Sequence, residues 1–451
     1  MGILDFFNNL FGVDSLGVVF RVVKAFWPFV VFPFIFILTK STWLFLRQSI
    51  YKSKCKYTVL EMLIPREILK SPQAMEQVLT GMHSLRNAPG KFNEHLSEKY
   101  WEGEVTNWFT LEFISIGGDV HFYIRCLAKR RALVEASFFS YYSDIELVEV
   151  PDYVSSFPKN TGELDEQSKE IFGGELTLSK EAAYPIKTYV DFESPDDAKK
   201  FDPASTFLEI MSKIKKGEFA GIQIIIAPAD YKWYKQFEKV LEKLKLPKVE
   251  KTEDEFKKLA KLYNRSPGET DIIKAVEKNF SKPAFDTIIR ILYMSDRGTF
   301  SDNFARKGII GAFSQYSALN LNSFRQNYKA GTRTQIWNPP YLFAYTRARY
   351  RKNRFLNYYL NREVAPETWM GKLITSYIWN WNFASKYVKM NTEAIASIYH
   401  PPTNLVLTAP HIKRVESKKA SPSAGMPIFG DDKDIEMFMP KKDKPADNKP
   451  K

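Results

Sequence analysis

Residues 108–127 read WFTLEFISIGGDVHFYIRCL, and this stretch decides the fold. Apolar and aromatic residues dominate Trp108–Ile116 and His121–Leu127, which predicts two β-strands. Gly117-Gly118-Asp119 between them is typical of a tight hairpin turn, because glycine accepts the positive φ angles that such turns require. The stretch therefore predicts an antiparallel hairpin.

The segments on either side of this hairpin alternate between strand and helix patterns. They predict, in chain order, a strand at Tyr57–Ile64, a helix at Pro72–Leu85, the hairpin, a helix at Arg131–Tyr142 and a strand at Ile145–Val150. This order is that of a ferredoxin-like βαββαβ unit, so we expect a first module over 57–155.

A second set of elements follows the same plan over 183–330. The expected elements are a strand at Ile186–Phe192, a helix at Pro203–Lys215, a strand at Phe219–Ala227, a strand at Phe285–Met294 and a helix at Phe300–Leu319. Lys and Glu at helical spacing over 230–280 predict a helical insertion that splits this module. The predicted fold class is therefore α+β, with two ferredoxin-like modules.

The N-terminal part of the chain has a membrane signature. Residues 25–46 are almost free of charge and are long enough for a transmembrane helix if Lys40 extends toward the interface. Apolar residues within 1–24 indicate a segment that lies in the membrane interface. A cleaved signal peptide is the alternative, but the small residues of a cleavage site are missing.

The positive residues that follow this segment set its expected orientation. Arg47, Lys52, Lys54 and Lys56 outnumber the cations before it, so the positive-inside rule places the C-terminal body in the cytoplasm. The prediction is a single-pass protein of the cell inner membrane. These four residues are the expected contacts to an anionic lipid bilayer.

Composition agrees with a folded body and a basic surface. The 451 residues are 44% hydrophobic and 26% charged, with a formal net charge of +13. Only two cysteines occur, Cys55 and Cys126, which excludes a disulfide framework and fits a reducing compartment. Residues 413–451 are rich in Lys, Asp, Pro and Ser and predict a disordered tail.

A basic and aromatic run occupies the last part of the body. Residues 303–362 contain eleven lysines and arginines and no acidic residue, and 331–412 form a basic and aromatic extension. The expected contacts to an anionic partner are Arg347, Arg349, Arg351, Lys352 and Arg354. A lipid surface, a protein partner and nucleic acid such as DNA are all compatible with this pattern, and so is a solvated basic face.

Short catalytic and ligand-binding motifs are missing from the sequence. Gly90-Lys91 is followed by Phe92 and lacks the other glycine of a phosphate-binding loop. The histidines are dispersed, without cysteines at zinc-ligand spacing, and no G-x-S-x-G elbow occurs. We therefore expect no catalytic residues, no cofactor and no metal, and a protein that is not an enzyme. An enzyme without short motifs is the alternative.

Three stretches carry a resemblance to a known family. These are YTVLEMLIPREILKSPQAMEQVLTGMHSL (57–85), EVTNWFTLEFISIGGDVHFYIRCLAKRRALVEASFFSYYSDIELVEV (104–150) and GEFAGIQIIIAP (217–228). They resemble the N-terminal, non-catalytic half of membrane-anchored bacterial type IV secretion and conjugation ATPases. MNTEAIASIYHPPTNLV (390–406) is similar to the segment that precedes the motor domain in such proteins.

The resemblance implies a membrane-anchored platform or adaptor of a type IV secretion or conjugation-like apparatus. The sequence departs from the family after residue 412, where a polar tail replaces the motor domain, so no ATPase residue carries over. The implied partner is a separately encoded P-loop ATPase, and the implied assembly is a homo-oligomer. The alternative function is a membrane-tethered nucleic-acid-binding protein that acts through 303–362.

Overall fold

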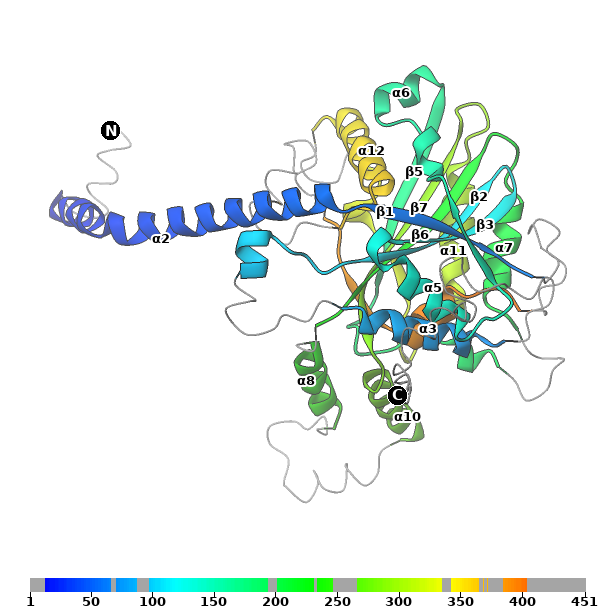
Figure 1. Ribbon diagram of the computed structural model, residues 1–451. Coiled ribbons are helices and arrows are strands. Elements are labelled where there is room, and N and C mark those ends of the chain that lie inside the picture. Colours follow the sequence, from blue (N-terminus) through cyan, green and yellow to red (C-terminus); the bar gives the residue numbers. More distant parts are fainter. Residues whose placement is uncertain are drawn as a thin grey trace, which may run out of the picture.

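A computed structural model describes residues 13–65, 70–86, 97–193, 201–230, 233–245, 266–334, 342–364, 368, 371 and 384–403. Within these residues the chain forms one nine-stranded sheet with helices on both faces, which confirms the α+β class (Figure 1). The strands are β1 Tyr57–Leu63, β2 Phe109–Ile116, β3 Asp119–Leu127, β4 Glu146–Val150, β5 Lys169–Leu178, β6 Phe219–Pro228, β7 Ala284–Asp296, β8 Phe324–Asn327 and β9 Val388–Asn391.

The sheet is continuous, which corrects the prediction of two ferredoxin-like modules. The strand order is β4-β1-β3-β2-β6-β7-β5-β8, and β9 pairs with β7. The antiparallel pairing of β2 with β6, which sets Ile114 opposite Gly221, joins the two halves. From the outer edge of the sheet toward this junction, the first half runs β4, β1, β3, β2 and the second half runs β8, β5, β7, β6. Each half therefore repeats the same arrangement of four consecutive strands. The hydrophobic core on one face of the sheet therefore extends across both halves, where two separate modules would each have had a core of their own.

The helices of the body separate by face. The helices and helical turns over one face include α3 Pro72–Ser84, α5 Arg131–Phe139, α7 Ala204–Ser212, η7 Phe304–Ile309, α11 Ile310–Ala312, η8 Phe313–Tyr316 and α14 Thr392–Ile398. The other face carries η3 Tyr153–Ser156, α6 Thr161–Glu166 and α12 Ala344–Leu360. Along β2, Phe113 packs with the first group and Ile114 with the second. Successive side chains of one strand thus pack into the hydrophobic cores on opposite faces of the sheet.

Helix α12 packs closely on the sheet because two glycines leave space for it. A Cβ at Gly221 on β6 would lie 2.0 Å from the Tyr359 hydroxyl oxygen. A Cβ at Gly173 on β5 would lie 2.2 Å from Phe355 Cε1. Neither distance is compatible with a side chain larger than hydrogen, so these glycines fix where α12 can sit.

In the body, several of the expected strands and helices are correct, and one expected strand is wrong. The hairpin turn lies at Gly117 and Gly118, both with positive φ. The strand expected at Ile186–Phe192 is wrong: this stretch contains only the 3₁₀ turn η4 Tyr189–Asp191. The strand in this part of the sheet is β5, which precedes it.

The insertion expected over 230–280 contains two described helices. They are α8 Tyr234–Lys245 and α10 Pro267–Phe280, which extend from one end of the sheet (Figure 1). Trp233, Phe237 and Phe280 pack between them. Residues 246–265 of the insertion lie outside the described residues, as do the tail 413–451 and residues 1–12.

The N-terminal helix α2, Val13–Lys54, projects far from the body (Figure 1). Within the part of the chain that the structure describes, no helix meets the length and apolarity needed to cross a membrane. The transmembrane helix expected over 25–46 is corrected accordingly. Large apolar side chains are nonetheless exposed along this helix, including Phe29 at 75% and Phe36 at 68%.

The remaining short elements connect these parts. They are η1 Ser97–Glu102, η2 Ala128–Arg130 and η9 Tyr328–Ala330.

Candidate functional site

The cations predicted to contact lipid lie at the root of α2. Lys54 and Lys56 are exposed, and Arg47 and Lys52 are partly buried. The Lys52 ammonium lies 5.6 Å from the centre of the Trp108 ring, which favours a cation–π interaction. The structure thus places these four residues where the helix meets the body.

A cavity of about 210 Å³ lies beside this root. Its lining includes Lys52, Arg86, Trp108, Asp230 and Asp286. Arg86 forms an ion pair with Asp230 at 3.1 Å, and Lys389 forms one with Asp286 at 2.6 Å. The carboxylates of the cavity are therefore neutralised by neighbouring cations.

The five residues predicted to contact an anionic partner do not form one exposed patch. Arg347, Arg351 and Arg354 point into the molecule and are 1%, 3% and 8% exposed. Arg349 is exposed and pairs with Asp165 at 3.3 Å, and Lys352 pairs with Glu170. The structure separates the set into three internal residues and two surface ion pairs.

The buried arginines of α12 bind the segment that precedes the helix. Arg351 donates hydrogen bonds to the carbonyl oxygens of Tyr328, Lys329 and Arg333 at 2.9–3.1 Å. Arg347 donates to the Leu342 carbonyl and to the Thr334 hydroxyl. Burial lowers the pKa of Arg351 to about 10. These two arginines thus tie the segment before α12 to the helix through its backbone carbonyl groups.

Spacing along α12 could have indicated this placement. Arg347, Arg351 and Arg354 are separated by four and three residues, so they share one face of a helix with Tyr358. Arg349 lies between them on a different face. This spacing is typical of the helix face that packs against the protein core. Arginines are seldom buried on such a face unless they have hydrogen-bond or ion-pair partners.

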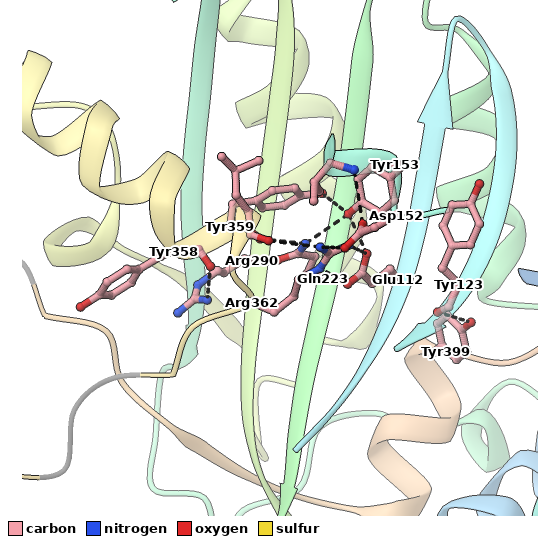
Figure 2. A network of polar contacts seen from close by, with 12 residues as sticks. Glu112, Tyr123, Asp152, Tyr153, Gln223, Arg290, Tyr358, Tyr359, Arg362 and Tyr399 are labelled. Atoms are coloured by element: carbon pink, nitrogen blue, oxygen red, sulfur yellow. Dashed lines mark hydrogen bonds and ion pairs between the residues drawn. The ribbon is translucent and has the colours of Figure 1, made fainter. Parts of the chain in front are cut away.

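A second group of buried charges lies where α12 ends against the sheet (Figure 2). The Arg362 guanidinium donates to both carboxylate oxygens of Glu112 at 2.9 and 3.1 Å. It also donates to both carboxylate oxygens of Asp152 at 2.7 and 2.9 Å. One arginine therefore joins β2, the segment after β4 and the end of α12.

Tyrosine and glutamine side chains complete this cluster. The Tyr153 hydroxyl donates to Glu112 at 2.6 Å and lies 3.2 Å from the Tyr359 hydroxyl. Gln223 on β6 donates to the Tyr153 hydroxyl and to the Tyr359 carbonyl, each at 3.2 Å. Burial and the adjacent Glu112 carboxylate raise the pKa of Tyr153 far above its usual value. Tyr153 is therefore a neutral donor.

The electrostatics of Arg362 follow from its two carboxylates. Burial alone would lower its pKa, but Glu112, with further contributions from Tyr153 and Asp152, outweighs that effect, and the pKa is raised. The guanidinium stays charged, and its bidentate contacts orient all three elements. This arrangement holds a helix on a sheet.

Arg290 makes a similar connection on β7. It donates to Glu175 on β5 at 2.8 Å and to the Tyr358 carbonyl at 3.1 Å, and it is fully buried. Ser385 donates to the same Glu175 oxygen at 2.8 Å. Arg290 on β7 and Arg362 just after α12 thus both bind carbonyl groups in the last turn of α12.

Sequence reasoning missed one further buried pair. His400 lies inside the body, with Nε2 2.9 Å from an Asp202 oxygen. Asp202 also accepts from the Thr403 backbone and hydroxyl, each at 2.9 Å. Burial opposes the charge of Asp202, but His400 and these donors together lower its pKa. The pair fastens the end of the described chain to α7.

No group of three or more histidine, cysteine, aspartate or glutamate side chains suited to a metal ion occurs within the described residues.

Residues 52–352 match the family described as "Domain of unknown function (DUF8128)". This match covers more than half of the chain, so the chain belongs to that family. It includes the sheet from β1 to β8 and leaves the apolar part of α2 outside. No curated protein matches the chain.

Proposed function

We propose that this protein is a non-catalytic platform that attaches to a membrane through α2 and docks a separate ATPase. The observation that carries the proposal is the exposed apolar surface of α2. Phe26, Trp27, Phe29, Phe32, Phe34, Ile35, Phe36 and Ile37 are each 49–75% exposed. Such a surface is costly in water, at about 25 cal/mol per Å² of apolar area.

The distribution of these side chains around α2 favours lipid over a protein groove. At 3.6 residues per turn, the eight positions leave no uncovered sector wider than about 80°. A helix that binds a protein groove needs one apolar face, whereas a helix with apolar residues all round is surrounded by an apolar medium. Lipid chains are such a medium. Lys54 and Lys56 then lie toward the anionic headgroups.

The proposed partner is a P-loop ATPase of a type IV secretion or conjugation-like apparatus, as the sequence resemblance implies. The body offers a sheet whose outer strands, β4 and β8, each pair with only one neighbour among the described strands. Such strands are docking sites for a partner's chain. The proposed location is the inner membrane, with the body in the cytoplasm.

Fractionation and pull-down of the full-length protein test this proposal. We expect it in the membrane fraction, and we expect a P-loop ATPase among the proteins recovered by gentle detergent extraction. Phe32→Lys with Phe36→Lys should release the protein from the membrane. Leu319→Lys is the matched control, because Leu319 is fully exposed on the body. A wild-type protein found only in the soluble fraction contradicts attachment, and recovery without an ATPase contradicts the docking role.

A further inference from the structure

The helical turn η1 packs against α2 just after its apolar part. The Trp43 indole nitrogen donates to the Tyr100 carbonyl oxygen at 2.7 Å. The chain then passes α2 at Gly103, whose φ is +73° and where a Cβ would lie 2.4 Å from the Arg47 carbonyl carbon. A hydrogen bond and a glycine contact thus hold η1 on the helix.

Aromatic and cationic side chains meet at this contact. Trp43 and Trp101 are 41% and 67% exposed, and their ring centroids are 6.1 Å apart. The Lys40 ammonium lies 5.1 Å from the centre of the Tyr100 ring. The Arg47 guanidinium lies 5.7 Å from the centre of the Trp43 ring. We call Lys40, Trp43, Arg47, Tyr100 and Trp101 the collar.

The collar separates two parts of α2 with different chemistry. On one side lies the dense run of exposed apolar residues from Phe26 to Ile37, which ends about 9 Å from Trp43 along the helix axis at 1.5 Å per residue. Leu46 and Ile50 beyond Trp43 are also exposed, but polar residues separate them. On the other side lies Lys52, about 13 Å from Trp43. Hydrocarbon, interfacial aromatics and cations follow one another in the same order across the surface of a bilayer.

We propose that the collar is a lipid-headgroup surface that seats the protein on an anionic bilayer. Trp43, Tyr100 and Trp101 lie at the level of the headgroups, where indole and phenol rings are stable, while Lys40 and Arg47 contact lipid phosphates. Glu98 and Glu102 on η1 also lie here, so specificity for anionic lipid depends on Arg47 and the lysines beyond it. This proposal rests on the proposed membrane attachment.

A collar built from two segments does more than one helix can do. α2 alone could rotate about its axis in lipid, because its apolar side chains point to all sides. Trp101 extends from η1, and hence from the chain that leads to β2, so its insertion fixes which side of the body faces the membrane. The headgroup contact thereby sets the orientation of the sheet.

Binding of the purified full-length protein to vesicles tests the collar. We expect tighter binding to phosphatidylcholine vesicles that contain phosphatidylglycerol than to phosphatidylcholine alone. Trp101→Ala should weaken binding to the mixed vesicles by roughly fivefold, which corresponds to about 1 kcal/mol. Tyr345→Ala is the matched control, because Tyr345 is 88% exposed on the body, and it should leave binding unchanged.

A spectroscopic measurement locates Trp101 directly. Lipids brominated near the headgroup should quench wild-type tryptophan fluorescence more than that of Trp101→Phe. Equal quenching and equal binding in wild type and both Trp101 variants would overturn the collar while attachment through α2 stands. Equal binding to both vesicle types would overturn its preference for anionic lipid. A wild-type protein that binds neither vesicle would overturn attachment itself.

Discussion

Two basic helices of this protein have opposite surroundings. In α12, Arg347, Arg351 and Arg354 face inward and bind groups of the protein itself, whereas at the end of α2 Lys54 and Lys56 face solvent. Both segments combine cations with aromatic residues in the sequence. The difference teaches that the number of positive charges says little about their role. The two helices differ in their packing: α12 packs on a face of the sheet, whereas α2 projects from the body (Figure 1).

The largest effect should come from the buried arginine at the end of α12. Arg362→Leu leaves Glu112 and Asp152 without their counter-ion, and removal of one partner of a buried ion pair costs about 3–5 kcal/mol. Chemical denaturation should report this loss. Arg349→Leu is the control on the exposed side, and its unfolding free energy should stay within about 0.5 kcal/mol of wild type.

A double substitution sharpens the same test. Glu112→Gln together with Arg362→Leu should cost less than the sum of the two single changes, because each single change leaves a charge unpaired. Additive costs would show that the two side chains do not interact in the folded protein.

A smaller effect is expected where α12 contacts the sheet. Gly221→Ala places a methyl group against the buried Tyr359 hydroxyl, and such overpacking typically costs about 1–3 kcal/mol. Thermal unfolding would measure the loss. Gly268→Ala in α10 is the matched control, since nothing lies within 4 Å of a Cβ there. If both variants unfold at the same temperature as wild type, Tyr359 of α12 does not lie against Gly221.

The smallest effect concerns a carboxylate on the opposite face. Burial opposes the charge of Glu393, but its hydrogen bonds with Lys282, Thr188 and Lys278 lower its pKa below the usual 4.5. Its stabilisation is therefore present above pH 4.5 and lost as the pH falls through the lowered pKa. Glu393→Gln should cost about 1.5 kcal/mol at pH 7. The gap to wild type should close on acidification, and a gap independent of pH between 7 and 3 contradicts this account.

The sequence predicts the first half of the sheet better than the second. The strands and helices from Tyr57 to Val150 follow clear apolar patterns, and the structure has them within a few residues. β5 escapes prediction because Gly173 and Gly174 interrupt its pattern, and the space at Gly173 is taken by Phe355 on α12, more than 180 residues later in the chain. The join between β2 and β6 depends on similarly distant contacts. Local patterns cannot report either of them.

The candidate sites show the same limit. The apolar part of α2 and the cations after it are visible as composition, and the structure leaves the apolar part, Lys54 and Lys56 exposed. The buried role of Arg347, Arg351 and Arg354 depends on the backbone acceptors of 328–333, which no pattern places beside α12. The collar depends on η1, which meets α2 only after the chain has passed through β1 and α3.

The connection between α2 and β1 has a mechanical consequence. Only Cys55 and Lys56 separate the helix from β1, which continues in nearly the same direction (Figure 1). β1 is held between β3 and β4, with its hydrogen bonds perpendicular to the strand. Tension along α2 therefore loads both ladders in shear, so that many bonds share the force at once. A body pulled through α2 in this geometry resists extraction of the strand far better than one peeled open from an edge.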